Sequence, residues 1–203
     1  MVNLSHYSGF NYTKSAFILN KSRLEHGLVH YYYGQGRGKT CTSIGTIIRA
    51  LGHGLRPILI QFLKLHDELA QHSGFFIGEI NFLKKLIPIK QFGSYEFIYP
   101  NKEIPEEHFS KADQGLEYAE RAIHSGTYDL VVLDEIAVAI SLKLINLDDV
   151  LKIIQDKPKR VEIIMTGASY INELEKIADY CTEFTCVNHP YYQGYDARPG
   201  IEF

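Results

Sequence analysis

The stretch from Val29 to Thr40, which reads VHYYYGQGRGKT, constrains the fold more than any other. An apolar, aromatic run is followed by three glycines at every second position and then by Lys39 and Thr40. A strand that passes through a glycine-rich turn into a helix exposes consecutive backbone N–H groups. Together with the positive end of the helix dipole, these groups suit a chain of phosphates. The stretch therefore predicts a strand, a phosphate-binding turn and a helix, in that order.

The glycine turn is a variant of the nucleotide-binding P-loop. Glycines avoid side chains that would block a phosphate, Lys39 supplies a cation for the outer phosphates, and Thr40 supplies a hydroxyl for Mg²⁺. The usual GxxxxGK(S/T) pattern has its first glycine where Tyr33 stands, so Gly34 comes one position late. The dinucleotide pattern GxGxxG also fails, and the remaining alternative is a glycine turn with a solvated lysine. The predicted nucleotide-binding residues of the turn are Gly34, Gln35, Gly36, Arg37, Gly38, Lys39, Thr40 and Cys41.

Apolar runs alternate with helical patterns along the rest of the chain. Strands are predicted at 29–33, 57–62, 86–92, 128–134, 161–165 and 182–187. Helices are predicted at 40–51, 106–125, 147–155 and 171–178, with a further short helix within 65–85. Continuous apolar strands separated by helices indicate an α/β fold with a central, mostly parallel six-stranded sheet flanked by helices. Residues 1–27 are interpreted as an N-terminal arm or added helix, and residues 28–203 as one domain.

An acidic residue at the end of a central strand should complete a nucleotide site. The apolar run YDLVVLD, followed by Glu135, supplies both Asp134 and Glu135 at such a position. A carboxylate there can hold Mg²⁺ directly or through water, and the sequence leaves open which of the two does so. Thr166 and Gly167 end the neighbouring predicted strand. They should face the same crevice, because ligands bind at the carboxyl ends of such strands.

Composition disfavours several classes of protein. The net charge is −3 without a block of one sign, which argues against a nucleic-acid partner. No apolar run approaches the roughly 18 residues that a membrane span needs, and the start MVNLSHYSGF lacks the layout of a signal peptide. The chain has three cysteines, a low and odd number, which argues against a disulfide framework. We expect a cytoplasmic protein with no membrane partner.

The ordered motifs resemble those of the P-loop ATP:corrinoid adenosyltransferases, the CobA/BtuR type. In chain order they are GQGRGKT, RALGHG, IQFLK, DLVVLDE, MTG and VNHPYYQGYDARPGIEF, and the resemblance covers about residues 28–203. It implies a RecA-like sheet, a homodimer, and transfer of the 5′-deoxyadenosyl group of ATP to the Co(I) centre of a corrinoid, with release of triphosphate. The implied ligands are ATP, Mg²⁺ and a corrinoid such as cobalamin. A flavoprotein reductase is the implied electron donor.

The resemblance also implies roles for residues outside the turn. Lys39 and Thr40, with Mg²⁺, would hold the departing triphosphate, and Glu135 would be a Mg²⁺ partner. Arg49, in RALGHG, would lie near the nucleotide; the alternative is a surface charge on its helix. The tail residue His189 would lie near the corrin.

Aromatic side chains in this family displace the lower axial ligand of the Co(II) corrinoid. The matching stretch here is FGSYEFIY, in which Tyr95 and Phe97 have the i, i+2 spacing, and Phe92 or Tyr99 could serve instead. The chain contains no tryptophan, although the family's stretch has one. The alternative is that this alternation marks a half-buried strand.

A further departure concerns the phosphate contacts. Ala168 follows Thr166-Gly167 where the family commonly has arginine, so Arg37 or Arg198 would have to compensate. Two other functions stay open on the sequence. One is a corrinoid or nucleotide carrier with little catalysis, and the other is a generic P-loop ATPase or kinase.

Overall fold

One parallel sheet forms the centre of the molecule, in a computed structural model that describes residues 23–66, 76–96, 98–99 and 101–202. Its strand order is β3-β2-β4-β5-β1-β6, and every pairing is parallel. The strands are β1 (Val29–Tyr33), β2 (Pro57–Phe62), β3 (Ile89–Phe92), β4 (Leu130–Asp134), β5 (Glu162–Thr166) and β6 (Tyr180–Glu183). The predicted α/β fold with six strands is confirmed, and the sheet is parallel throughout.

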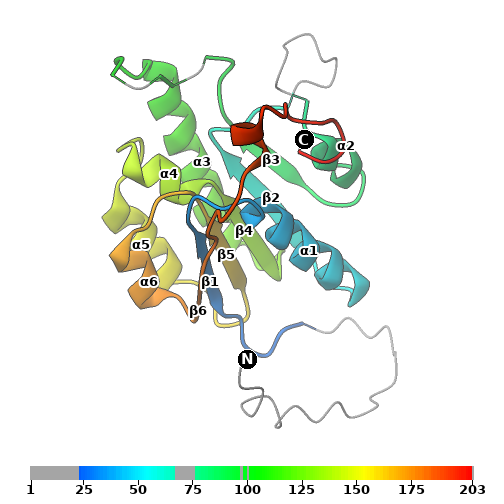
Figure 1. The fold of residues 1–203 in the computed structure, drawn as a ribbon. Helices are drawn as coiled ribbons and strands as arrows, with labels where there is room; N and C mark the ends of the chain where they lie inside the picture. Colours follow the sequence, from blue (N-terminus) through cyan, green and yellow to red (C-terminus); the bar gives the residue numbers. More distant parts are fainter. Residues whose placement is uncertain (1–22, 67–75, 97, 100, 203) are drawn as a thin grey trace.

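Helices cover both faces of the sheet (Figure 1). On one side lie α1 (Lys39–Gly52) and α2 (Gly78–Leu83). On the other side lie α3 (Glu106–His124), α4 (Ile136–Ser141), α5 (Leu147–Gln155) and α6 (Asn172–Ile177). A 3₁₀ helix, η2 (Pro190–Gln193), belongs to the tail that follows β6.

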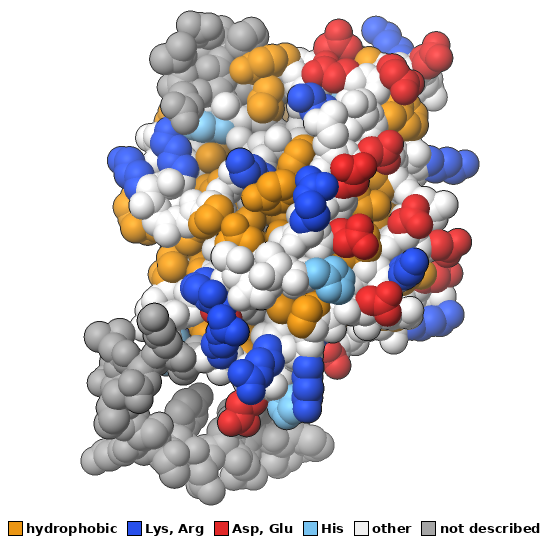
Figure 2. Space-filling model, turned by 180° about the vertical axis from the view of Figure 1, so that it is seen from behind, with side chains coloured by type: hydrophobic (Ala, Val, Ile, Leu, Met, Phe, Trp, Pro, Cys, Tyr) orange, Lys and Arg blue, Asp and Glu red, His pale blue; other side chains and the backbone are white. Residues whose placement is uncertain are grey.

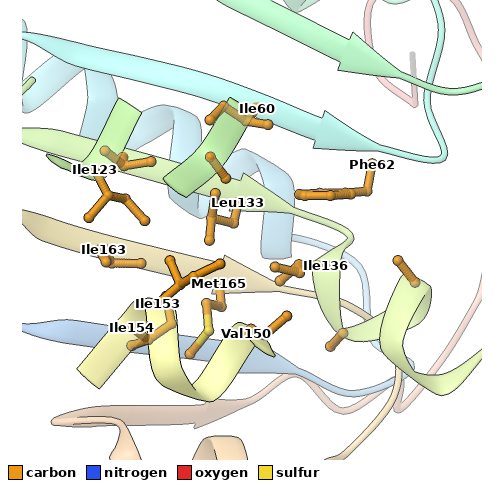
Figure 3. Packing of buried hydrophobic residues seen from close by; sticks show 14 of the residues in the cluster. Ile60, Phe62, Ile123, Leu133, Ile136, Val150, Ile153, Ile154, Ile163 and Met165 are labelled. Atoms are coloured by element: carbon orange, nitrogen blue, oxygen red, sulfur yellow. The ribbon is translucent and has the colours of Figure 1, made fainter. Parts of the chain in front are cut away.

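Alternation along each strand divides the core into two layers. On β4, Val131 and Leu133 pack with the layer of α3 to α6, whereas Leu130 and Val132 pack with the layer of α1 and α2. Figure 3 shows the first layer, in which side chains of β2, β4 and β5 meet those of α3 and α5. Because both faces of these strands are buried, their sequences are continuously apolar, which is why the sequence revealed them.

Two predicted strands differ from the structure by at least three residues at one end, and one helix was not predicted. Residues 86–88 follow the end of α2, where the Leu86 N–H donates to the Leu83 carbonyl at 2.8 Å, so β3 starts only at Ile89. The last strand spans 180–183 instead of 182–187, because the chain turns away after Glu183 to contact the glycine turn. The sequence patterns do not predict the helix α4, which begins directly after Glu135.

Some expectations fall outside the described residues. These include all but residues 23–27 of the proposed N-terminal arm, and Phe97 of the aromatic pair. Among the helices that the structure describes, none could span a bilayer. On the face drawn in Figure 2, acidic and basic side chains are intermixed, with hydrophobic side chains exposed between them.

A pair of helical glycines offers a test of the packing. In α3, a Cβ at Gly115 would lie 2.8 Å from the Phe62 ring and 3.1 Å from Phe92, whereas a Cβ at Gly45 in α1 would meet nothing within 4 Å. We expect Gly115→Ala to lower the free energy of unfolding by about 1–3 kcal/mol through overpacking. Gly45→Ala, the matched control, should raise it by about 0.5–1 kcal/mol through helix propensity. Denaturant unfolding measures both; equal effects of the two changes would contradict the packing described.

Candidate functional site

The glycine turn packs against the segment that leaves β6. Gly34 and Gly38 have φ angles of 105° and 116°, which side-chain-bearing residues rarely adopt. A Cβ at Gly36 would lie 2.5 Å from the Phe184 carbonyl, and the Gly36 N–H donates to that carbonyl at 2.6 Å. The glycines therefore allow a close contact within the chain itself, in addition to the access for phosphate that the sequence predicts. One amide of the predicted phosphate cradle is already used internally.

The side chain of Lys39 folds back over the glycine turn. Its Nζ donates to the carbonyls of Gly34 and Gly36 at 2.6 and 2.7 Å. Desolvation is the main cause that lowers the pKa of Lys39, the Lys64 ammonium adds to it, and the carboxylates of Glu135 and Asp134 oppose it. The Lys39 ammonium thus lies over the glycine turn. There it could give up its hydrogen bonds to the two carbonyls and bind phosphate oxygens instead.

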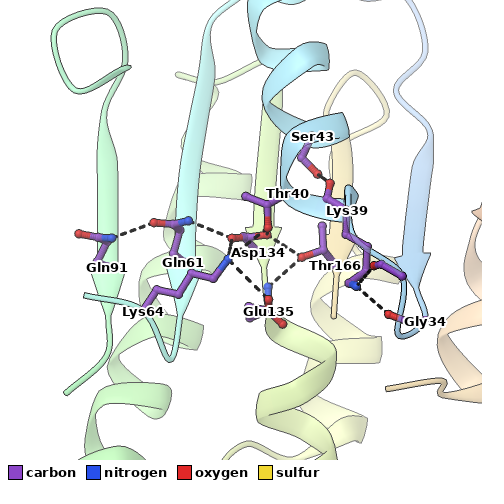
Figure 4. A network of polar contacts seen from close by, with 11 residues as sticks. Gly34, Lys39, Thr40, Ser43, Gln61, Lys64, Gln91, Asp134, Glu135 and Thr166 are labelled. Carbon is purple, nitrogen blue, oxygen red and sulfur yellow. Dashed lines mark hydrogen bonds and ion pairs between the residues drawn. The ribbon is translucent and has the colours of Figure 1, made fainter. Parts of the chain in front are cut away.

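Asp134 lies at the centre of a polar network (Figure 4) and is fully buried. Its Oδ1 accepts hydrogen bonds from Thr40 at 3.0 Å and from Thr166 at 2.7 Å. Its Oδ2 accepts from Gln61 Nε2 at 2.9 Å and from Lys64 Nζ at 2.7 Å. A buried carboxylate needs such compensation, because charge is costly to remove from water. The loop, β2, β4 and β5 are all tied to this one group.

Lys64 is the site residue that sequence reasoning missed. Its Nζ also donates to Thr40 Oγ1 at 3.2 Å and lies 3.5 Å from Glu135 Oε1. Desolvation opposes the charged form of Lys64, but Asp134 and Glu135 outweigh it and raise the pKa of Lys64. The sequence feature that could have pointed to this polar network is Gln61, within the apolar run PILIQF. A polar residue in a buried strand needs a hydrogen-bond partner. Gln61 stands opposite Asp134 in the sheet register.

The two acidic residues differ in what they can bind. Both oxygens of Asp134 are engaged by the chain itself. Glu135 has a φ of 64°, its N–H donates to Thr166 Oγ1 at 2.9 Å, and its side chain is 23% exposed. The Lys64 ammonium lies between oxygens of Asp134, Thr40 and Glu135, and hard oxygen ligands of this kind fit Mg²⁺. The donor set therefore suits the predicted metal, with Glu135 the more accessible carboxylate.

The other predicted residues are distributed unevenly around this centre. Thr166 belongs to the network, and Gly167 allows close packing against α4, where its Cβ would lie 2.7 Å from that of Ala137. Gln35, within the turn, and Cys41, in the first turn of α1, are both exposed. Tyr95 is 47% exposed and follows the end of β3.

Arg49 is not brought to the glycine turn. It lies in the last turn of α1, ten residues from Lys39, which corresponds to roughly 15 Å along the helix. It is exposed and lines a different cavity with His30 and Glu162. The predicted role of Arg49 near the nucleotide stays a prediction, and its exposure on α1 also fits the alternative of a surface charge on the helix.

The C-terminal tail meets the turn through Arg37. Arg37 Nη1 lies 3.1 Å from Glu202 Oε1, and its Nη2 donates to the Ile201 carbonyl. Arg198 pairs with the same carboxylate at 3.1 Å. Hydrogen bonds from Arg198 are the main cause that lowers the pKa of Glu202 to about 2. His189 and Arg37 line a cavity of about 730 Å³ between the tail and the turn.

Lys64→Met tests the network. It leaves Asp134 buried without its cation, so we expect the free energy of unfolding at pH 7 to fall by about 3 kcal/mol. Lys152→Met, on the exposed face of α5, is the matched control and should change it little. An equal loss in both variants would contradict the role given to Lys64.

The same pair predicts a pH profile. Burial opposes ionisation of Asp134, but Lys64 and the hydrogen bonds overcome it and hold the pKa of Asp134 below its ordinary 3.8. The stability that this carboxylate contributes is therefore present above pH 3.8 and lost as the pH falls through the lower folded value. In Lys64→Met desolvation is less opposed, so the acid limb of the unfolding free energy should move to higher pH. Urea unfolding at several pH values measures this, and an unmoved limb would contradict it.

Comparisons with known proteins agree with this geometry. A family model described as ATP:corrinoid adenosyltransferase BtuR/CobO/CobP matches residues 25–203. The corrinoid adenosyltransferase of Pseudomonas aeruginosa is 28% identical over 185 residues, which cover 90% of this chain and 87% of that protein. That of Escherichia coli is 26% identical over 179 residues, covering 88% and 87%. The protein all2391 of Nostoc is 34% identical over 171 residues, covering 81% of this chain and 45% of its own length.

A solved structure shares the fold. The flagellar accessory protein FlaH of Methanocaldococcus jannaschii superposes with a TM-score of 0.53 at 16% identity, covering 81% of this chain and 74% of that chain. At this identity the likeness concerns the fold alone, and it agrees with the predicted RecA-like P-loop class. Because the family model extends over nearly all of the described residues, the chain belongs to the ATP:corrinoid adenosyltransferase family.

Proposed function

We propose that this chain transfers the 5′-deoxyadenosyl group of ATP to the Co(I) centre of a corrinoid and releases triphosphate. Membership of the family supports the reaction class. The observation that carries the assignment to this site is the convergence of Lys39, Thr40, Asp134 and Glu135 at the end of the parallel sheet. The relatives of Pseudomonas and Escherichia coli bear the name of the same activity.

The reaction is a substitution at the ribose C5′, and it requires stabilisation of the departing triphosphate. The Co(I) electron pair forms a bond to the ribose C5′, and the C5′–O bond to triphosphate breaks. Charge develops on the departing oxygen, where the Lys39 ammonium can neutralise it after leaving the Gly34 and Gly36 carbonyls. No phosphoryl group moves, so the turn grips the triphosphate as a unit.

The residues that would hold Mg²⁺ are Thr40, through its hydroxyl, and Glu135, through its carboxylate. Asp134 would join them directly or through water as Lys64 yields its place. The ion would supply further positive charge to the triphosphate. Until that exchange the Lys64 ammonium offsets the mutual repulsion of the Asp134 and Glu135 carboxylates, because it lies between them.

The wider proposal follows the family. The protein would act as a homodimer in the cytoplasm, with an electron donor such as a flavoprotein reductase supplying Co(I). Tyr95 and Phe97 would meet the lower face of the corrinoid, and His189 would face it from the tail. Residues 28–203 would form the transferase domain, preceded by an arm at 1–27.

Lys39→Ala tests the assignment of the site. We expect a loss on the order of 3 kcal/mol in transition-state stabilisation, because one preorganised charge partner of the leaving group is removed. The measurement is the decay of the Co(I) absorption spectrum after addition of ATP and Mg²⁺, with triphosphate assayed alongside. Lys152→Ala, an exposed charge on α5, is the control and should keep the full rate.

The products separate this function from the alternatives. Stoichiometric adenosylcorrinoid and triphosphate support the proposal. Tight binding of both ligands without turnover would assign the chain as a carrier. ADP or phosphate as the primary product would assign it as an ATPase or kinase. An undiminished rate in Lys39→Ala would show that the triphosphate binds elsewhere.

A further inference from the structure

The C-terminal tail that follows β6 meets the glycine turn at two places. Directly after the strand, the Phe184 carbonyl accepts a hydrogen bond from the Gly36 N–H at 2.6 Å. Further along, the Ile201 carbonyl and the Glu202 carboxylate both accept from the guanidinium of Arg37. Figure 1 shows the tail in red as it leaves β6 and runs past the turn between β1 and α1. The tail is therefore in direct contact with the turn at which the nucleotide is proposed to bind.

The tail takes up donors of the turn that suit phosphate. Backbone N–H groups at the start of a helix and arginine guanidinium groups are common donors to phosphate oxygens. Here the Gly36 N–H and the Arg37 guanidinium donate to tail oxygens instead. The planar fork of an arginine fits a carboxylate and a phosphate in the same way. At Arg37, the Glu202 carboxylate is therefore a chemical substitute for a phosphate.

Arg198 holds the Glu202 carboxylate independently of the turn. The Arg198 backbone N–H donates to Glu202 Oε2 at 2.7 Å, and its guanidinium donates to both carboxylate oxygens at 3.1 Å. When Arg37 binds another anion, Glu202 thus keeps a positively charged neighbour four residues away in the chain. An ion pair between largely exposed side chains contributes little stability, and the Arg37 side chain is 48% exposed. Arg37 can therefore leave Glu202 at a small cost.

From these contacts we infer that Arg37 exchanges the Glu202 carboxylate for the triphosphate of ATP, and that the tail leaves the glycine turn when the nucleotide binds. The inference rests on the proposed function, because it takes the turn as the triphosphate site. A triphosphate brings several negative charges to the turn, and these attract Arg37 and repel Glu202. The tail is thus an internal competitor of the nucleotide.

The exchange also affects the cavity of about 730 Å³ between the tail and the turn. Arg37, Arg198 and Glu202 line this cavity together with His189. The pair of Arg37 and Glu202 joins the two walls of the cavity, because one residue belongs to the turn and the other to the tail. Loss of this pair removes a contact between the walls. Nucleotide bound at the turn therefore changes the surroundings of His189 without contacting it.

Glu202→Gln tests the competition, because it removes the charge and keeps the size of the side chain. We expect the dissociation constant for inorganic triphosphate with Mg²⁺, measured by isothermal titration calorimetry, to fall about threefold, since one exposed ion pair no longer has to be broken. Asp196→Asn neutralises another exposed carboxylate of the tail and is the matched control, which should change the constant little. An equal gain in both variants would reveal a general effect of charge and overturn the exchange. A weaker affinity in Glu202→Gln would overturn it as well, because Glu202 would then position Arg37 for phosphate.

Arg37→Ala shows whether the effect of Glu202 passes through Arg37. The variant should weaken triphosphate binding about tenfold, the value of one hydrogen bond from a charged donor. In this background Glu202→Gln should bring no further gain, because the side chain for which Glu202 competes is absent. Independent effects of the two changes, or an undiminished affinity in Arg37→Ala, would contradict the exchange.

Hydrogen exchange reports whether the tail leaves the turn. The N–H groups of Ile201 and Glu202 donate to the Arg198 carbonyl at 3.1 and 2.9 Å. A single turn of this length is not stable by itself, so its protection depends on the contact with Arg37. We expect exchange in residues 198–202 of the native chain, followed by mass spectrometry, to become faster when triphosphate and Mg²⁺ are added. Slower exchange would mean that the tail closes onto the ligand, and unchanged exchange that it stays in place; either result would overturn the inference.

The failure of this inference is distinguishable from failure of the proposed function. Adenosylation by the native chain, together with an unchanged triphosphate affinity in Glu202→Gln, would overturn only the exchange. The expected changes in affinity and hydrogen exchange, without adenosylation of a reduced corrinoid, would support the exchange and overturn the proposed function. A native chain that binds neither ATP nor triphosphate would overturn both.

Discussion

The buried carboxylate of Asp134 organises this protein. A charge removed from water must be compensated nearby, and here the compensation comes from three separate parts of the chain. Thr40 reaches it from the start of α1, Thr166 from the end of β5, and Gln61 and Lys64 from β2 and the residues after it. Gln61 in turn accepts from Gln91 on β3 at 2.8 Å. A single group therefore aligns the edge of the sheet at which ligands of this fold bind.

The glycines of the turn meet two separate structural requirements. Its glycines suit the predicted phosphate contact, and they also allow Phe184 to come within hydrogen-bonding distance of Gly36. Arg37 extends the same contact to Glu202 near the chain end. The tail is thus bonded to the turn that would hold the nucleotide. A change in either one alters the surroundings of the other, because they share these hydrogen bonds.

Polar groups are paired to different extents in two neighbouring regions. The network around Asp134 is fully paired, and its charges stabilise one another. A cavity of about 620 Å³ next to it, between Leu63 and Val138, is lined by His108, whose ring nitrogens have no hydrogen-bond partner, at a cost to the folded state. Both regions are joined through the backbone at Lys64, against which Gly93 packs.

Much of the fold was readable from the sequence, because burial on both faces makes parallel strands continuously apolar. The order of strand, glycine turn, lysine and threonine also predicted the turn and α1, since these depend on neighbouring residues. Tertiary contacts decided the rest. The strand β6 ends where it does because Phe184 contacts the glycine turn. Lys64 reaches Asp134 because β2 lies beside β4. The distance of Arg49 from the glycine turn is set by the length of α1. Local patterns determined which elements form; only the packing of distant segments decided which side chains share a site, because burial and charge pairing act through space.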